Sequence, residues 1–206
     1  ALSHEAIRTR VQDVLNALSS NGQSLSYISG EVAAHEALRS FIDERIATYA
    51  DDRNDPSKNG LSGLSPYLHF GHVSSLRVAL EVAAQGTSTG ADALIEEMVV
   101  RKELSDNYCF YNGKYDNVSG AAEWAQKTLV KHTADVREFH YTRDAFEKAN
   151  THDPAWNAAQ QQLVRTGKMH GYMRMYWAKK VLEWSTTPQE AIDTLIYLND
   201  FYSIDG

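Results

Sequence analysis

The sequence is poor in several features that define whole classes of protein. Its 206 residues contain a single cysteine, Cys109, so no disulfide can form within the chain, and an intracellular location, cytoplasmic or nuclear, is expected. No apolar run approaches the roughly 18 residues that a membrane-spanning helix needs. GxSxG, Walker A and GxGxxG motifs are absent, and the eight histidines include no HxxxH pair. The sequence therefore predicts no membrane span, no metal site and none of the commonest hydrolase or nucleotide-binding loops.

Alternation of apolar and polar residues, which is typical of strands, is scarce, and apolar residues instead recur every three or four positions. This period predicts one all-α domain of about eight helices. The polar segment 51–60 is predicted to be a loop, and Thr187 followed by Pro188 predicts a helix start. The predicted helical stretches are 7–18, 34–49, 73–84, 91–108, 121–131, 141–149, 155–164, 170–184 and 188–198.

The formal net charge of -7 argues mildly against nucleic acid as a partner, because binding to phosphates requires positive potential. Positive charge is nevertheless concentrated between Asp153 and Glu183, where no carboxylate intervenes. This stretch is either a solvated helix face or a basic sector that docks a phosphate-bearing ligand. Its basic residues are Arg165, Lys168, Arg174, Lys179 and Lys180.

Two segments contain residues suited to ligand binding. In the first, Ser62, Gly63 and Ser65 offer hydroxyls and close backbone approach, which suits a diphosphate but is also common in ordinary turns. In the second, Glu97 and Arg101 are four residues apart on a predicted helix. They are expected either to form a surface ion pair or to place the Glu97 carboxylate in a cleft.

Tryptophans are grouped near the C-terminal end of the sequence. Trp177 and Trp184 are seven residues apart, so they share a helix face and lie roughly 10 Å apart along its axis. Trp156 belongs to the preceding predicted helix. Spacing alone favours a structural core over a chain of indoles for electron transfer, although it is compatible with both.

Taken together and in order, several longer motifs resemble class II DNA photolyases over roughly residues 31–206. The block KMHGYMRMYWAKK within 166–184 is the most specific of them. The others are YADDRNDP (49–56), LSGLSPYLHFGHVSS (61–75), EEMVVRKELSDNYCFYN (96–112), THDPAWNAAQ (151–160) and AIDTLIYLND (191–200).

This resemblance implies a helical domain that binds FAD in a folded, U-shaped conformation. It also implies repair of UV-damaged DNA: light-excited reduced flavin gives an electron to a cyclobutane pyrimidine dimer that is flipped out of the duplex, the dimer splits, and the electron returns. The protein would supply binding, orientation and electrostatics, and flipping costs least at a poorly stacked lesion.

The resemblance also assigns residues to the cofactor. Asn199 is expected near the flavin N5, Asp205 at the flavin ring, and Arg174 along the isoalloxazine. The positions that match the ribityl and diphosphate site are Tyr49, Leu61, Ser62, Gly63, Leu64 and Ser65.

Further assignments concern DNA and electron transfer. Glu97 matches the active-site glutamate that hydrogen-bonds the dimer. Arg53 and Arg101 match positions at the DNA-facing mouth, and Lys168 of the basic sector is the third expected DNA contact. The expected photoreduction chain runs from Trp177 through Trp156 to Trp184.

In domain organisation, residues 1–30 are expected to form a helical N-terminal appendage, and residues 31–206 the FAD-binding domain with a truncated C-terminal end. The α/β antenna domain of the family is not expected within these 206 residues. Two other functions stay open: a cryptochrome-like flavin photoreceptor without repair activity, and a cofactor-free helical remnant that binds nucleic acid or a partner through the basic sector.

Overall fold

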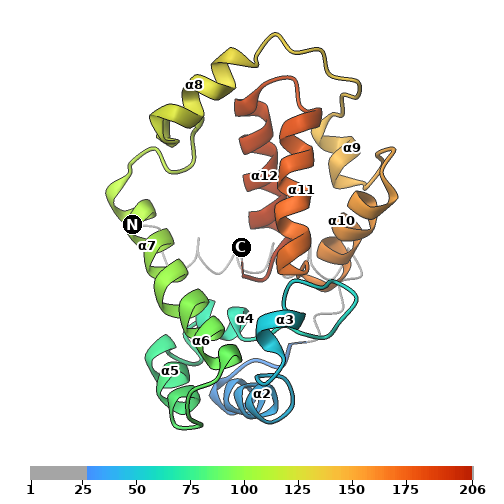
Figure 1. Ribbon diagram of the computed structural model, residues 1–206. Helices are drawn as coiled ribbons and strands as arrows, with labels where there is room; N and C mark the ends of the chain where they lie inside the picture. The colour runs from blue at the N-terminus through green and yellow to red at the C-terminus, as the bar shows by residue number, and fades with distance from the viewer. Residues whose placement is uncertain (1–26, 206) are drawn as a thin grey trace, which may run out of the picture.

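The computed structural model describes residues 27–205, and every regular element in that range is a helix (Figure 1). The all-α prediction is therefore confirmed for the described residues, whereas the predicted helix 7–18 lies outside them. None of the described helices is long and apolar enough to cross a membrane.

The first group of helices covers residues 31–111. It consists of α2 (Glu31–Glu44), α3 (Tyr49–Asp52), α4 (Ser65–His69), α5 (Ser75–Ala83), α6 (Thr89–Ile95), the π-helical turn η1 (Glu96–Arg101) and α7 (Lys102–Tyr111).

The second group begins with the 3₁₀ turn η2 and runs to the C-terminal end of the described chain. It consists of η2 (Val118–Gly120), α8 (Glu123–Lys131), α9 (Arg143–Glu147), α10 (Pro154–Thr166), α11 (Gly171–Trp184) and α12 (Pro188–Tyr202).

Side-chain caps account for several helix boundaries. The predicted start of α12 is confirmed: Thr187 Oγ1 accepts a hydrogen bond from the Glu190 amide at 3.1 Å, and Pro188 occupies the first turn. Ser74 caps α5 by accepting from the Arg77 amide at 3.1 Å, so this helix starts later than the apolar pattern from Val73 predicts. Capping bonds of this kind satisfy backbone amides that have no partner within the helix.

Two short helices were not predicted from the sequence. α3 occupies the first part of the segment predicted to be a loop, and α4 follows the serine-glycine segment 61–65. Both are shorter than two turns, so neither contains enough residues to show a helical apolar period.

The N-terminal core is mainly aliphatic. Leu38, Phe41, Val78 and Val82 are fully buried within it. At Gly90, α6 lies against the backbone of Ile46. An added Cβ would lie 1.7 Å from the Ile46 carbonyl oxygen, so only glycine permits this approach. The other members of this core are Ala34, Tyr49, Leu64, Tyr67, Val73, Ala91, Leu94 and Met98.

The C-terminal core is rich in aromatic residues. Trp156, Trp177 and Trp184 are at most 3% exposed and pack with Phe146 between α9, α10, α11 and α12. Its remaining members are Ala159, Leu163, Met169, Val181, Ala191, Leu198 and Tyr202.

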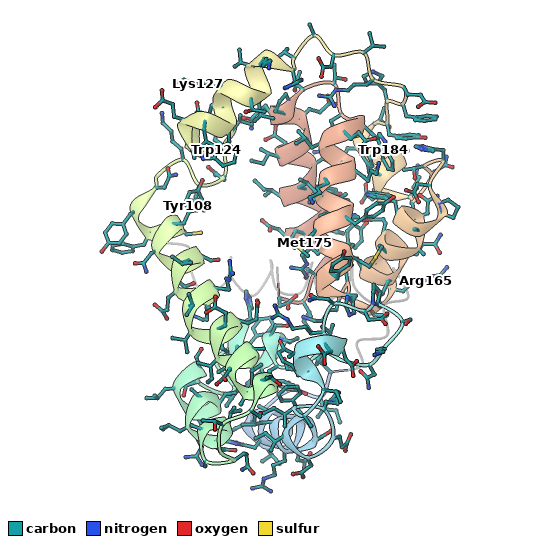
Figure 2. The ribbon with its side chains drawn as sticks, viewed as in Figure 1. Tyr108, Trp124, Lys127, Arg165, Met175 and Trp184 are labelled. Carbon is teal, nitrogen blue, oxygen red and sulfur yellow. The ribbon has the colours of Figure 1, made fainter. Side chains whose placement is uncertain are left out.

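Helices α7 and α8 bury no residue and extend away from both cores. Figure 2 shows Trp124 on α8, away from Trp184 on α11. Trp124 is 74% exposed, so it is the one tryptophan of the four that does not belong to the C-terminal core.

Candidate functional site

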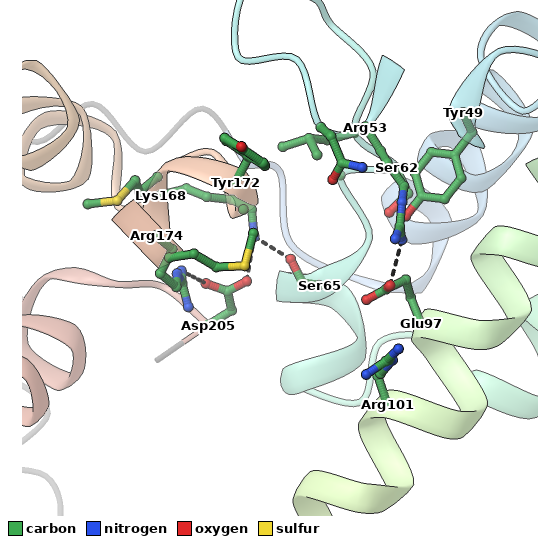
Figure 3. Close-up of a pocket in the computed structure, with 16 residues that line it drawn as sticks. Tyr49, Arg53, Ser62, Ser65, Glu97, Arg101, Lys168, Tyr172, Arg174 and Asp205 are labelled. Carbon is green, nitrogen blue, oxygen red and sulfur yellow. Dashed lines mark hydrogen bonds and ion pairs between the residues drawn. The ribbon is translucent and has the colours of Figure 1, made fainter. Parts of the chain in front are cut away.

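A cavity of about 640 Å³ lies where the two groups of helices meet (Figure 3). Its volume is within the range of small-molecule and cofactor sites, roughly 300–1,000 Å³. α3, the segment 61–65 and η1 form its N-terminal wall, and the α10–α11 connection, the start of α11 and Asp205 form its C-terminal wall. The lining residues are Tyr49, Arg53, Asn54, Leu61, Ser62, Gly63, Ser65, Glu97, Arg101, Lys168, Met169, Gly171, Tyr172, Arg174, Met175 and Asp205.

Arg53 and Glu97 form an ion pair on the N-terminal wall, with Arg53 Nη1 2.6 Å from Glu97 Oε1. The Arg53 guanidinium also lies 5.8 Å from the centre of the Tyr49 ring. The hydrogen bond to Glu97 raises the pKa of Arg53, and burial raises the pKa of the Tyr49 hydroxyl. This contact fixes the Glu97 carboxylate at the cavity surface while leaving 41% of the side chain exposed.

The predicted ion pair between Glu97 and Arg101 was wrong, because these residues lie in a π-helical turn. In η1 the partner of a side chain shifts from four residues away to five, and Arg101 Nε accordingly lies 3.2 Å from Glu96 Oε1. Glu97 is thereby available to Arg53 on the same wall of the cavity. The second interpretation of the sequence, a carboxylate in a cleft, agrees with this geometry.

The segment 61–65 belongs to the N-terminal wall of the cavity. Gly63 has φ +72°, a left-handed conformation that favours glycine, and an added Cβ would meet no atom within 4 Å. Leu64 points away from this cavity into the N-terminal core, where it is 1% exposed. The buried Leu64 anchors the segment while Ser62 and Ser65 stay at the cavity surface.

A partly buried cluster of charges joins the two walls. Lys168 Nζ donates hydrogen bonds to Ser65 Oγ on the N-terminal wall and to Asp205 Oδ2 on the C-terminal wall. Arg174 Nη2 lies 3.4 Å from Asp205 Oδ1, and Ser203 Oγ donates to the same oxygen at 2.8 Å. The cluster thus contains two cationic groups and one carboxylate.

Burial and charge act in opposite directions on this cluster. Burial alone would raise the pKa of Asp205, but the attraction and hydrogen bond of Lys168 outweigh it and hold that pKa well below its usual range. Burial lowers the pKa of Lys168, and the neighbouring Asp205 carboxylate opposes this shift. Asp205 is therefore ionised although only 7% of its side chain is exposed, because its cationic neighbours stabilise the negative charge.

The three expected DNA contacts differ in accessibility. Arg101 is 65% exposed and Arg53 26% exposed, whereas Lys168 is 18% exposed and held in the charge cluster. Arg101 is therefore the most accessible of the three, whereas Arg53 and Lys168 are each held in an ion pair.

The three tryptophans lie behind the cavity rather than in its lining. Trp177 follows the cavity-lining Arg174 by one turn of α11. The Trp177 and Trp156 rings are nearly parallel, with centroids 6.4 Å apart and an interplanar angle of 9°. Trp156 and Trp184 have centroids 6.1 Å apart at 64°. The indoles thus form a continuous contact series that begins near the cavity, and they also serve as core, so the two interpretations of their spacing are compatible.

Asn199 lies on α12 outside the cavity lining, and its amide donates to Asp200 Oδ1 at 3.3 Å. Its expected position beside the flavin stays a prediction. Sequence reasoning did not single out Asn54, Met169, Tyr172 or Met175, which line the cavity. Asn54 lies within the YADDRNDP segment. The other three lie in the KMHGYMRM block, whose alternate helical faces could have been separated into cavity and core positions.

The donor set of the cavity fits a flavin nucleotide. Ser62, Ser65 and Lys168 provide hydroxyl and ammonium groups for phosphates, and Arg174 provides a guanidinium. Met169, Met175 and Tyr172 supply apolar and aromatic surface against which a ring system can pack. The fold and the site together define a helical domain with a charged, cofactor-sized cavity between two cores.

Comparisons with known proteins identify relatives of this domain. The chain is 58% identical over 184 residues to a deoxyribodipyrimidine photo-lyase of Oryza sativa subsp. japonica. This alignment covers 86% of the chain and 36% of the relative. It is 50% identical over 177 residues to a deoxyribodipyrimidine photo-lyase of Methanothermobacter thermautotrophicus. That alignment covers 86% of the chain and 39% of the relative. The chain therefore spans little more than a third of the length of the curated relatives it matches. No protein-family model matches it.

A solved structure shares the fold. A bacterial class III photolyase from Agrobacterium tumefaciens superposes with a TM-score of 0.58 at 21% identity, covering 88% of this chain and 39% of that one. Over most of its length the chain is thus homologous to deoxyribodipyrimidine photolyases, which confirms the family resemblance.

Proposed function

We infer that this chain is the FAD-binding, electron-transferring part of a light-driven photolyase that repairs cyclobutane pyrimidine dimers in DNA. The observation that carries this proposal is one cavity that contains most residues assigned by the resemblance, drawn from segments more than a hundred positions apart. Homology to named photolyases supports DNA repair, and the identity of the cofactor and lesion is part of the proposal.

In this proposal Ser62, Ser65 and Lys168 would hold the diphosphate, and Arg174 with Asp205 would lie along the flavin. The bound FAD would supply light-driven electron donation to the dimer. Asp205 is prevented from protonating by its cationic neighbours, so it would offer a fixed negative charge and accept hydrogen bonds.

Glu97 would bind the flipped dimer by a hydrogen bond, and Arg53 would orient the Glu97 carboxylate through the 2.6 Å ion pair. Arg101, at the exposed rim, would contact the DNA backbone. This local positive charge would let a chain of net charge -7 bind a polyanion. A cytoplasmic or nuclear location follows from this substrate.

The proposal is tested with the purified chain, FAD, a reductant and DNA that contains cyclobutane dimers. Blue light should restore the dimers to pyrimidines. Glu97→Gln should retain FAD binding and photoreduction but slow repair about tenfold or more, because removal of one transition-state contact costs on the order of 1.4 kcal/mol or more. Glu103→Gln is the matched control, since Glu103 is exposed on α7. An FAD-loaded, reduced chain that leaves dimers intact would contradict the proposal.

A flavin photoreceptor without repair activity is the second candidate function, and the three contacting indoles are as compatible with it as with repair, since photoreduction through them would not require Glu97. It predicts photoreduction without repair. The third candidate, a cofactor-free basic surface, is weakened by the charge pairing. Lys168 and Arg174 are bound to Asp205, and Lys180 is 2.8 Å from Glu183, so the basic sector is not a continuous exposed face.

A further inference from the structure

Gln160 is a completely buried polar residue in the middle of the aromatic core. Its side chain lies on α10 and contacts α11 through a hydrogen bond in which the Trp177 indole N–H donates to Gln160 Oε1 at 2.8 Å. Burial of an amide costs free energy unless its hydrogen bonds are made. An apolar residue would fill the same space without that cost. Packing alone therefore does not explain a glutamine here, and its hydrogen bond to Trp177 is the feature that an apolar residue could not supply.

The orientation of the Gln160 amide is set by its two partners. Gln160 Nε2 donates to the Glu147 backbone carbonyl at 3.4 Å, which leaves Oε1 as the group that faces Trp177. An indole N–H can only donate, so it requires the oxygen of the amide rather than its nitrogen.

The neighbouring indole has the same kind of partner. The Trp156 N–H donates to the Trp177 backbone carbonyl at 3.0 Å. Both acceptors are neutral amide oxygens, which are hydrogen-bond acceptors but do not take up a proton at neutral pH. The carboxylate of Asp153, which caps the start of α10, accepts instead from the Tyr176 hydroxyl and from the Trp156 backbone amide at 3.1 Å.

This arrangement determines the fate of Trp177 once it has lost an electron. An indole that has lost one electron is far more acidic than the neutral ring and can lose its N–H proton to water or to a nearby base. Trp177 is 3% exposed, and among the described residues its N–H is bonded to the Gln160 oxygen, which is not a base. The ring then stays a radical cation, which can still be reduced by Trp156, whereas a deprotonated radical would trap the oxidation at Trp177.

We propose that Gln160 is a positioning residue that keeps oxidised Trp177 protonated, so that the positive charge passes on to Trp156. One electron moves from Trp156 to Trp177 in this step, and each indole keeps its proton. The proposal rests on the proposed electron-transfer function, and Gln160 acts through Trp177 rather than on a substrate.

The test creates the oxidised indole without flavin. In a Trp124→Phe background only Trp156, Trp177 and Trp184 remain, and an ultraviolet laser pulse ejects an electron from one of them into a dissolved halocarbon scavenger, which releases halide. Transient absorption then distinguishes the protonated from the deprotonated indole radical. At a pH high enough to ionise the introduced carboxyl, whose pKa burial raises, Gln160→Glu places a carboxylate base at the Trp177 N–H and should accelerate appearance of the deprotonated radical by about tenfold or more.

Gln161→Glu is the matched control, because it makes the same change on the exposed face of the same helix and should leave the radical unchanged. Equal radical lifetimes in folded Gln160→Glu and in the parent would overturn the proposal. If Gln160→Glu does not fold, the parent decides the question: transfer without proton movement should proceed equally fast in H₂O and D₂O, and slowing in D₂O would overturn the proposal.

The same samples separate this proposal from the proposed function. Failure of FAD to bind or to be photoreduced would contradict the proposed function while the flavin-free radical data still report on Gln160. Normal photoreduction with no effect of Gln160→Glu on the radical would contradict the role of Gln160 alone.

Discussion

The two cores of the molecule differ in their side-chain composition. The N-terminal core is mainly aliphatic and contains no indole among its described residues, and it supports the segment 61–65 and the Arg53–Glu97 pair, whereas the C-terminal core contains three indoles that lie in contact. Aliphatic side chains can only fill space, but stacked indoles also provide redox-active rings at close separation. This difference agrees with the proposed function, in which the first core supports the binding cavity and the second combines packing with electron transfer.

The largest expected effects come from deletion of a central aromatic residue in either core. Phe41→Ala and Trp156→Ala remove side chains that are 0% exposed, and each should lower the free energy of unfolding by roughly 3–5 kcal/mol. Denaturant titration measures this. A small loss for either variant would show that the corresponding core is not close-packed.

Conservative variants then separate packing from redox chemistry. Trp156→Phe should retain the fold but abolish photoreduction of added FAD, because a phenyl ring is far harder to oxidise than indole. Phe41→Leu, the matched change in the N-terminal core, should leave the photoreduction rate unchanged. Similar photoreduction in both variants would remove the functional difference between the cores.

The next largest effect concerns the contact between the cores. Lys168→Met leaves the Asp205 carboxylate buried without its main partner and should destabilise the fold by about 3 kcal/mol. Lys127→Met is the control, since Lys127 and its partner Glu123 are 73% and 83% exposed, and it should change stability little. Equal stability of the two variants would show that Lys168 does not hold the walls together.

The pH dependence of stability sharpens the same point. The pKa of Asp205 is lower in the folded state than the roughly 3.9 of an unfolded chain. Its stabilising contribution is therefore complete above about pH 4 and is lost as the pH falls through the folded-state pKa. Asp205→Asn should lose stability less steeply below pH 4 than the parent, and exposed Asp116→Asn should follow the parent curve. Parallel curves for the parent and Asp205→Asn would contradict the assignment.

The smallest predicted effects are those of helix caps in the two halves. Thr187→Ala at α12 and Ser74→Ala at α5 each remove one capping bond and should cost about 1 kcal/mol. Thermal unfolding measures both. Because α12 leads directly to Ser203 and Asp205, loss of FAD affinity in Thr187→Ala alone would show that cap strength is coupled to the cavity.

The long helices were predictable because their residues carry an apolar stripe over several turns. Helices α10, α11 and α12 were predicted to within a few residues, and the Thr187 cap was recognisable from one hydroxyl, one proline and one glutamate. Helices α3 and α4 were not predictable, since four or five residues contain little more than one helical turn.

The site was only partly predictable. The motif around Ser62 and the KMHGYMRM block indicated which residues belong to it, largely through resemblance to a family. The partner of Glu97 was missed because a π-helical turn changes which side chains are adjacent, and apolar periodicity does not register one extra residue in a turn. The partner of the Trp177 N–H was missed because Gln160 has no sequence signal that separates it from exposed Gln161.

The sequence by itself determined the helical class and the positions of the long helices, because these depend on local periodicity, and its resemblance to a family indicated many of the residues that line the cavity. Only the tertiary structure decided which charges meet: Arg53 with Glu97, and Lys168 with both Ser65 and Asp205. Lys168, for example, is 103 positions from Ser65 and 37 positions from Asp205 in the sequence. Their energies depend on burial, which local sequence does not specify.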